Sequence, residues 1–248
     1  MKLKNISRVS ENYWISFSDI MTGLMVIFMF ISISYILEVQ KKQKQRDLIF
    51  EEFKATKDSL YAELQNEFKD DFKEWDIELD KDLSIKFTNP DVLFESGETR
   101  IRPKFEKILD EFLPRYFDIL LQDKYKDKIV EVRIEGHTDT VPIHKYDEDP
   151  YIGNIILSQL RSTEVLKYFR KMNYFKHLPK EKKLKLQFWL TSNGLGYGRT
   201  LDDDKGLSAL SGKPINNSFS RRVEFRIITS SERLVNDILK KIEEEKEK

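Results

Sequence analysis

The sequence predicts an α/β sandwich preceded by one transmembrane helix and a helical linker. Two observations support this fold class. Strongly apolar residues are concentrated in one N-terminal block, residues 14–37, although 35% of the whole chain is charged. After residue 75, segments that alternate with period two are interleaved with segments of helical period, which is typical of strands alternating with helices.

The apolar block predicts a transmembrane helix at residues 13–38, with residues 1–12 before it. Its 24 residues at 14–37 contain one formal charge, Asp19, and they extend about 36 Å as a helix, against a hydrocarbon core of about 30 Å. The alternative is a cleaved signal peptide, which has a shorter apolar region and a small-residue cleavage site. Glu38-Val39-Gln40-Lys41-Lys42 follows the block instead, so we expect an uncleaved anchor.

Residues 39–74 contain neither proline nor glycine and predict a helical linker. Its apolar residues recur at steps of three and four, interrupted by Thr56: the stripe runs through Ile49, Phe53, Thr56, Leu60, Leu64, Phe68 and Phe72, followed by Trp75. This stripe either packs on the chain's own domain or pairs with a second copy in a dimeric stalk. The sequence leaves both interpretations open.

Residues 75–230 predict one domain, and residues 231–248 predict a charged C-terminal helix that Ser231 can cap. We expect the helix that begins at Pro103 to kink or break at Pro114. The expected elements of the domain are strands at 77–79, 83–87, 129–135, 184–190 and 222–228, helices at about 103–121 and 154–172, and a long loop at 192–220.

Three short motifs follow one another within this domain: Gly136-His137-Thr138-Asp139, then Asn154-x-x-Leu157-Ser158-x-x-Arg161, then Arg221-Arg222-Val223-Glu224. Together they resemble the OmpA-like peptidoglycan-binding domain that OmpA, Pal and MotB share. The resemblance covers residues 75–230 and implies an OmpA-like α/β (α+β) sandwich, peptidoglycan as a partner and a periplasmic domain. It also implies that residues 1–12 are cytoplasmic.

The resemblance assigns the ligand-binding roles to Asp139 and Arg161. Diaminopimelate in the peptidoglycan stem carries an ammonium and a carboxylate, which an aspartate and an arginine complement. A structural salt bridge between the two residues is the alternative. The other expected peptidoglycan-binding residues are Asn154 at the helix start, Leu157 in the pocket wall, Tyr151 as a lid, and Arg222. The chain departs from the family at Ser220 and in the loop 140–151.

Asp19 is expected to carry a proton within the membrane. A charged carboxylate near the centre of a membrane helix costs about 2.5–3.5 kcal/mol, so such residues are usually functional. Asn12, Ser16, Asp19 and Gly23 form a polar, small ridge, and the same stripe is apolar further along the helix. The alternative is an interfacial carboxylate close to Trp14.

The run Trp14-Ile15-Ser16-Phe17-Ser18-Asp19-Ile20-Met21-Thr22-Gly23-Leu24-Met25 resembles ZorB subunits of the Zorya anti-phage system, and MotB shares much of it. This resemblance implies a peptidoglycan-anchored stator-type subunit of a proton-driven motor in the inner membrane. It also implies a homodimer surrounded by a ring of a multi-span ZorA/MotA-like subunit. A flagellar MotB-like stator and a passive cell-wall tether are the alternatives.

Composition and motifs also exclude some functions. Lysine plus arginine equals aspartate plus glutamate, at 43 each, and no basic patch is interleaved with aromatic residues, so we expect no nucleic-acid partner. The chain has no cysteine, and its three histidines lack metal-ligand spacing. With no nucleophile–base pair and no phosphate loop, we expect neither an enzyme nor a cofactor; the transported ion is expected to be H⁺, with sodium left open.

Overall fold

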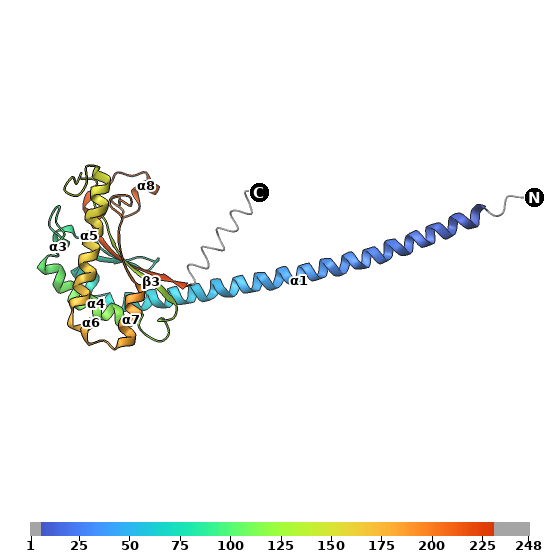
Figure 1. Cartoon of the computed structure of the whole chain (residues 1–248), viewed down its shortest axis with the longest axis horizontal. Helices are drawn as coiled ribbons and strands as arrows, with labels where there is room; N and C mark the ends of the chain where they lie inside the picture. The colour runs from blue at the N-terminus through green and yellow to red at the C-terminus, as the bar shows by residue number, and fades with distance from the viewer. Residues whose placement is uncertain (1–5, 231–248) are drawn as a thin grey trace, which may run out of the picture. The chain divides into compact units, whose positions relative to one another are not determined.

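The computed structural model describes residues 6–230, and the chain divides into two units between Glu51 and Glu52. Helix α1 (Ile6–Phe68) starts in the first unit and ends in the second (Figure 1). From Phe17 onward it is long and apolar enough to cross a membrane, as predicted, by length and composition. The expected C-terminal helix at 231–248 lies outside the described residues.

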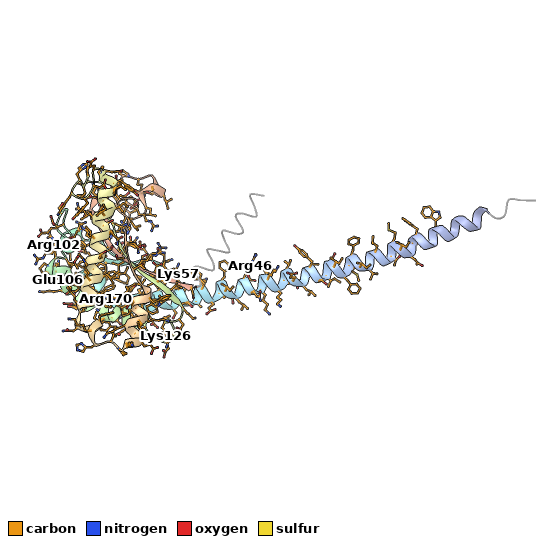
Figure 2. All side chains as sticks on the ribbon, in the orientation of Figure 1. Arg46, Lys57, Arg102, Glu106, Lys126 and Arg170 are labelled. Carbon is orange, nitrogen blue, oxygen red and sulfur yellow. The ribbon has the colours of Figure 1, made fainter. Side chains whose placement is uncertain are left out.

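In the first unit the described large apolar side chains of the apolar block of α1 are exposed. They project on all sides of the helix (Figure 2). A helix that exposes apolar residues all round needs a nonaqueous environment, such as lipid or the helices of another protein. The exposure therefore agrees with a membrane span.

The second unit is built on a five-stranded mixed sheet with the order β1-β2-β5-β3-β4. The strands are β1 (Ile77–Leu79), β2 (Ser84–Phe87), β3 (Ile129–Gly136), β4 (Leu190–Gly194) and β5 (Val223–Thr229). The β3–β4 pair is parallel and the other pairs are antiparallel. The last strand in sequence therefore occupies the centre of the sheet, so the sheet is complete only when both ends of the domain have folded together.

Helices cover one face of this sheet (Figure 1). The main ones are α4 (Pro103–Leu120), α5 (Pro150–Lys171) and α7 (Lys180–Trp189). The short helices are α2 (Asp71–Glu74), α3 (Pro90–Leu93), α6 (Asn173–His177), α8 (Ser208–Ser211) and α9 (Asn217–Ser220). The opposite face carries the charged side chains of β2, β3 and β5, so the predicted α/β sandwich is confirmed.

The C-terminal part of α1 packs on its own domain. Leu60, Leu64 and Phe68 are fully buried in the core, and the Phe68 ring lies 5.1 Å from the Phe112 ring. Thr56 is also buried, where its Oγ1 accepts a hydrogen bond from Lys128 Nζ. The first of the two interpretations of the linker is therefore correct from Thr56 onward, whereas pairing of residues 39–55 between copies stays a prediction.

The predicted strand at 184–190 is wrong. Residues 180–189 form α7, and β4 begins only at Leu190. Leu184, Leu186 and Phe188 alternate as in a strand, but Leu186 is buried together with Trp189, while Leu184 and Phe188 are exposed. The spacing of three between the buried residues is helical, and it decides the structure because packing against the core outweighs the local alternation.

Two predicted helix features also need correction. Helix α5 starts at Pro150, four residues before the predicted Asn154, because proline suits the first helical turn and Asp149 caps it by accepting a hydrogen bond from Tyr151 N at 2.8 Å. Helix α4 continues through Pro114 without a break. Buried Leu113 and Tyr116 lie on either side of this proline, and their packing offsets the missing backbone hydrogen bond.

Phe112 is central to the core, since its ring lies within 5.2 Å of the rings of Phe68, Phe87, Tyr116 and Phe225. Replacing it with alanine should lower the free energy of unfolding by about 3–5 kcal/mol, because it leaves a cavity that rigid neighbours cannot fill. Urea unfolding of the detergent-solubilised chain, followed by tryptophan fluorescence, measures this. The matched control is Phe188→Ala at a 74% exposed position, which should change the value by less than about 0.5 kcal/mol. Equal effects of both variants would contradict this assignment of the core.

Candidate ligand-binding site

A pocket lies at the carboxyl end of β3. It is bounded by the residues that follow β3, the residues that precede β5, the first half of α5, and the segment from Pro90 to Arg102. The sheet end that forms it is opposite the end where α1 joins the domain, since Lys128, just before β3, binds Thr56 on α1. The pocket and the attachment of α1 therefore occupy opposite ends of one sheet.

Glycines bring the first two motifs together. A Cβ on Gly136 would lie 2.2 Å from Ser158 O, and a Cβ on Gly194 would lie 2.4 Å from Gln159 N. Only glycine permits such close approach of a helix backbone to a strand. Helix α5 therefore lies directly on the ends of β3 and β4, and this contact places Arg161 in the same pocket as Asp139.

Asp139 is buried and already has partners. Its Oδ1 accepts a hydrogen bond from Val141 N at 3.1 Å, and its Oδ2 forms an ion pair with Arg221 Nη1 at 2.9 Å. The alternative of a direct Asp139–Arg161 salt bridge is not what the structure has. Sequence reasoning missed Arg221, although the pair Arg221-Arg222 contained a signal: neighbouring residues at the start of a strand point to opposite sides.

Arg161 is held in the pocket wall by main-chain oxygens. Its Nε donates to Glu98 O at 2.9 Å, its Nη2 donates to Glu95 O at 3.1 Å, and its guanidinium lies 5.0 Å from the centre of the Phe94 ring. Burial lowers the pKa of Arg161 to about 10, although the nearby charge of Asp139 opposes the shift. Arg161 is therefore a cation at neutral pH, and no carboxylate among the described residues forms an ion pair with it.

Asn154 lies inside α5 rather than at its start, so its predicted capping role is wrong. Its Nδ2 donates to Val141 O and to Pro150 O, each at 3.0 Å. These two bonds fix the amide so that Oδ1 is an acceptor, and this buried Oδ1 has no hydrogen-bond partner among the described residues. Thr138 Oγ1 shares this property, and both residues line the pocket. Buried polar atoms are normally paired, so these atoms point to a polar ligand.

Of the other predicted binding residues, Leu157 lies in the pocket wall, as predicted, and Tyr151 does not. Tyr151 belongs to the first turn of α5, and its ring packs 5.1 Å from the Tyr197 ring. In the divergent loop, Val141 and Ile143 form an apolar part of the wall, and a Cβ on Gly153 would lie 1.8 Å from Ile143 O. The predicted lid is thus replaced by a loop packed tightly on α5.

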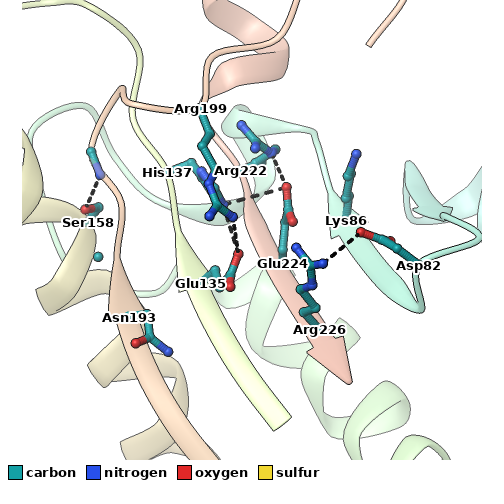
Figure 3. Close-up of polar contacts among 12 residues, drawn as sticks. Asp82, Lys86, Glu135, His137, Ser158, Asn193, Arg199, Arg222, Glu224 and Arg226 are labelled. Atoms are coloured by element: carbon teal, nitrogen blue, oxygen red, sulfur yellow. Dashed lines mark hydrogen bonds and ion pairs between the residues drawn. The ribbon is translucent and has the colours of Figure 1, made fainter. Parts of the chain in front are cut away.

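Arg222 lines the pocket but pairs within the sheet. Its Nε donates to Glu224 Oε1 at 2.5 Å, and Glu224 belongs to a buried group with Glu135 and His137 (Figure 3). The side-chain atoms of these three residues that could coordinate a metal ion lie within 4.8 Å of one another. The spacing of the residues in the sequence did not reveal this proximity. Arg222 pairs with Glu224, and Arg199 Nη1 lies 3.9 Å from Glu135 Oε2, so two arginines balance the two glutamates without a metal ion.

His137 is neutral in this buried group. Burial lowers its pKa, and the charge of Arg222 lowers it further. Burial tends to raise the pKa of Glu224, but the charges of Arg222 and Lys86 keep it below its usual value. The group therefore combines an ionised glutamate, an arginine and an uncharged imidazole immediately behind the pocket.

Asp19 lies exposed on α1 in the first unit, near Thr22 and Gly23. Thr22 Oγ1 donates to Ser18 O at 2.8 Å, so this hydroxyl is satisfied within the helix. A Cβ on Gly23 would meet nothing within 4 Å. The face is therefore open to a neighbouring helix. The side chains of Asn12 and Ser16, the other members of the predicted ridge, lie outside the described part of the chain.

Comparison with known proteins decides the family. The Zorya protein ZorB of Escherichia coli is 37% identical over 234 residues, covering 92% of this chain and 93% of that protein. The chain belongs to the ZorB family. Residues 93–208 also match the model of the OmpA family, so the ZorB-family chain carries an OmpA-like domain containing Asp139 and Arg161.

Solved structures with a similar fold include periplasmic and OmpA-like domains. The periplasmic domain of Helicobacter pylori MotB (residues 78–256) is 18% identical, with a TM-score of 0.39, covering 63% of this chain and 83% of that one. The OmpA-like domain of FopA1 from Francisella tularensis is 17% identical, with a TM-score of 0.35, covering 62% and 81%. With scores this low, the family assignment rests on the ZorB relative and the OmpA match.

The neutral state of His137 predicts a pH-dependent stability. The ordinary histidine pKa is about 6.5, so below that pH the unfolded chain takes up a proton that the folded chain resists. The free energy of unfolding should therefore decrease as the pH falls from about 7.5 to about 5.5. Urea unfolding across this range measures the decrease, which His137→Asn should flatten and His177→Asn, at an exposed site, should leave intact. The same slope in His137→Asn as in the unmodified chain would contradict the assignment.

Proposed function

We propose that this chain is a peptidoglycan-anchored, stator-type subunit of a proton-driven motor in the inner membrane, used for anti-phage defence. The observation that carries the anchoring role is the convergence of Asp139 and Arg161 in one pocket of an OmpA-like domain. The defence role is supported by the 37% identity to the Zorya protein ZorB. The same relationship to ZorB favours a role in defence over a flagellar MotB-like role.

The chemistry of the pocket supports a peptidoglycan stem peptide as the ligand. Asp139 can accept from the ammonium of diaminopimelate, and so can the unpaired Oδ1 of Asn154. Arg161 can pair with the carboxylate, because its hydrogen bonds within the described part of the domain go to main-chain oxygens. Leu157, Val141 and Ile143 provide apolar surface for the hydrocarbon chain between these charges.

The position of the pocket supports a load-bearing anchor. The ligand would bind at one end of the sheet, and α1 joins the domain at the other end, through contacts such as Lys128 with Thr56. A pull between the wall and the membrane would then act along β3 and β5, which share a long hydrogen-bonded ladder. Peptidoglycan binding requires a periplasmic domain, so residues 1–12 would be cytoplasmic.

Asp19 is the proposed proton carrier. An isolated carboxylate in an apolar helix is costly unless it is protonated or has a partner. The open face around Asp19, Thr22 and Gly23 fits close packing against other helices. We propose that two copies of α1 lie side by side within a ring of a multi-span ZorA/MotA-like subunit. Proton transit through Asp19 would drive this ring.

Removing the charge of Asp139 should release the protein from the cell wall. Asp139→Asn and Arg161→Ala should each weaken binding to purified peptidoglycan by more than about tenfold, because loss of one partner of a desolvated charge pair costs about 2–5 kcal/mol. Co-sedimentation of the detergent-solubilised chain with peptidoglycan sacculi measures the affinity. Arg170→Gln, an exposed arginine at the C-terminal end of α5, is the matched control. Undiminished binding by both pocket variants would exclude this pocket as the anchor.

Asp19→Asn should abolish the proposed motor function without affecting peptidoglycan binding. This variant should abolish protection against phage in a plaque assay but bind peptidoglycan normally, because the amide keeps the shape of the side chain and cannot transfer a proton. Asp47→Asn, at an exposed aspartate on the same helix outside the apolar block, should protect fully. If Asp19→Asn protects while Arg161→Ala does not, the chain is a passive cell-wall tether.

A further inference from the structure

Both carboxylate oxygens of Asp139 already have partners within the protein. Arg221 Nη1 lies 2.9 Å from Asp139 Oδ2, and Val141 N binds the other carboxylate oxygen. An ammonium group that approaches Asp139 therefore meets an arginine that already holds this position. Because Asp139 is buried, it cannot simply turn towards solvent to accept a second cation.

Arg221 is the more exposed member of this pair. The side chain of Arg221 is 40% exposed, whereas that of Asp139 is 7% exposed. Apart from the bond that its Nη1 donates to Asp139 Oδ2, the Arg221 guanidinium forms no hydrogen bond with the described residues. The neighbouring Arg161 contrasts with it, because two main-chain carbonyls and the Phe94 ring fix its guanidinium.

The charges of the pocket require an anion as well as a cation. Arg222 is balanced by Glu224, so Asp139 is left with two arginines, Arg161 and Arg221. An ammonium alone would take Asp139 and leave both arginines without a carboxylate. A ligand end that carries both an ammonium and a carboxylate gives each of the three groups an oppositely charged partner, with the carboxylate shared by the two arginines.

We propose that Arg221 is the specificity-determining residue of the pocket: it leaves Asp139 when the ligand ammonium binds and pairs with the ligand carboxylate, together with Arg161. The pocket then selects stem peptides in which the side-chain carboxylate of diaminopimelate is free. Stems with amidated diaminopimelate, or with lysine in its place, offer the ammonium without the carboxylate. This inference rests on the proposed peptidoglycan-binding function.

The fixed acceptor on Asn154 supports this exchange. Its Oδ1 lies in the same pocket, has no hydrogen-bond partner among the described residues, and cannot be exchanged for Nδ2 because Val141 O and Pro150 O hold the amide. An ammonium has three donors, so it can bind Asn154 and Asp139 together. The Arg221 guanidinium donates to Asp139 and forms no hydrogen bond with Asn154 among the described contacts. The ligand ammonium thereby gains a contact that Arg221 does not make.

Titration calorimetry on the full-length chain in detergent tests the proposal with three synthetic stem tripeptides. They end in diaminopimelate, in diaminopimelate with an amidated side-chain carboxylate, or in lysine. The unmodified chain should bind the first at least about tenfold more tightly than the other two, since a charge-assisted pair is lost with each of them. Arg221→Gln should reduce this preference to less than about threefold, because the free-carboxylate peptide loses a partner and the other two no longer compete with Arg221 for Asp139.

Two further variants complete the test. Arg221→Lys keeps the charge without the planar fork and should show an intermediate preference, which also provides an answer if Arg221→Gln fails to fold. Arg170→Gln should behave as the unmodified chain. If the unmodified chain binds the diaminopimelate peptide and both Arg221 variants keep its full preference, the role of Arg221 is refuted while the proposed function stands. If the unmodified chain binds none of the peptides, the proposed function itself fails.

Discussion

The contact between α5 and the ends of β3 and β4 is the constraint on which the pocket depends. It exists because Gly136 and Gly194 have no side chain, so the backbone of α5 can approach to a distance that any Cβ would prevent. Ser158 and Gln159 strengthen it: Ser158 Oγ accepts from Gly196 N at 2.9 Å, and Gln159 Oε1 accepts from Gly194 N at 2.7 Å. Without this contact, the motifs that contain Asp139 and Arg161 would lie on separate layers.

Electrostatics then determines how the charged groups of the pocket are stabilised by one another. Several charged groups are gathered where little water reaches them, which is costly unless each has a partner. The protein meets this cost in three ways. Arg222 pairs with Glu224 inside the sheet, Arg161 donates to main-chain carbonyls, and Asp139 pairs with Arg221. Of these pairings, only the last uses a half-exposed side chain, and it is therefore the easiest to exchange for a ligand.

The same sheet connects this pocket with the C-terminal part of α1. Strand β5, the last in sequence, lies between β2 and β3, so it joins segments from both ends of the domain. Strand β3 ends at the pocket and begins next to Lys128, which binds α1. A domain built this way can carry a load from one end to the other through backbone hydrogen bonds, without relying on surface contacts.

The sequence alone predicted a helix long and apolar enough to cross a membrane, the order of most elements, and most of the pocket residues, although it missed Arg221 and wrongly placed Tyr151 there. These features are local: an apolar run of sufficient length, periodic patterns and short motifs all lie in continuous stretches. The contacts among the pocket residues were not predictable. Asp139 pairs with Arg221 rather than Arg161, Asn154 lies inside its helix, and residues 184–189 are helical despite their alternation. Only the tertiary structure decided these points, because they depend on which distant segments pack together, and burial outweighs local preference wherever the two disagree.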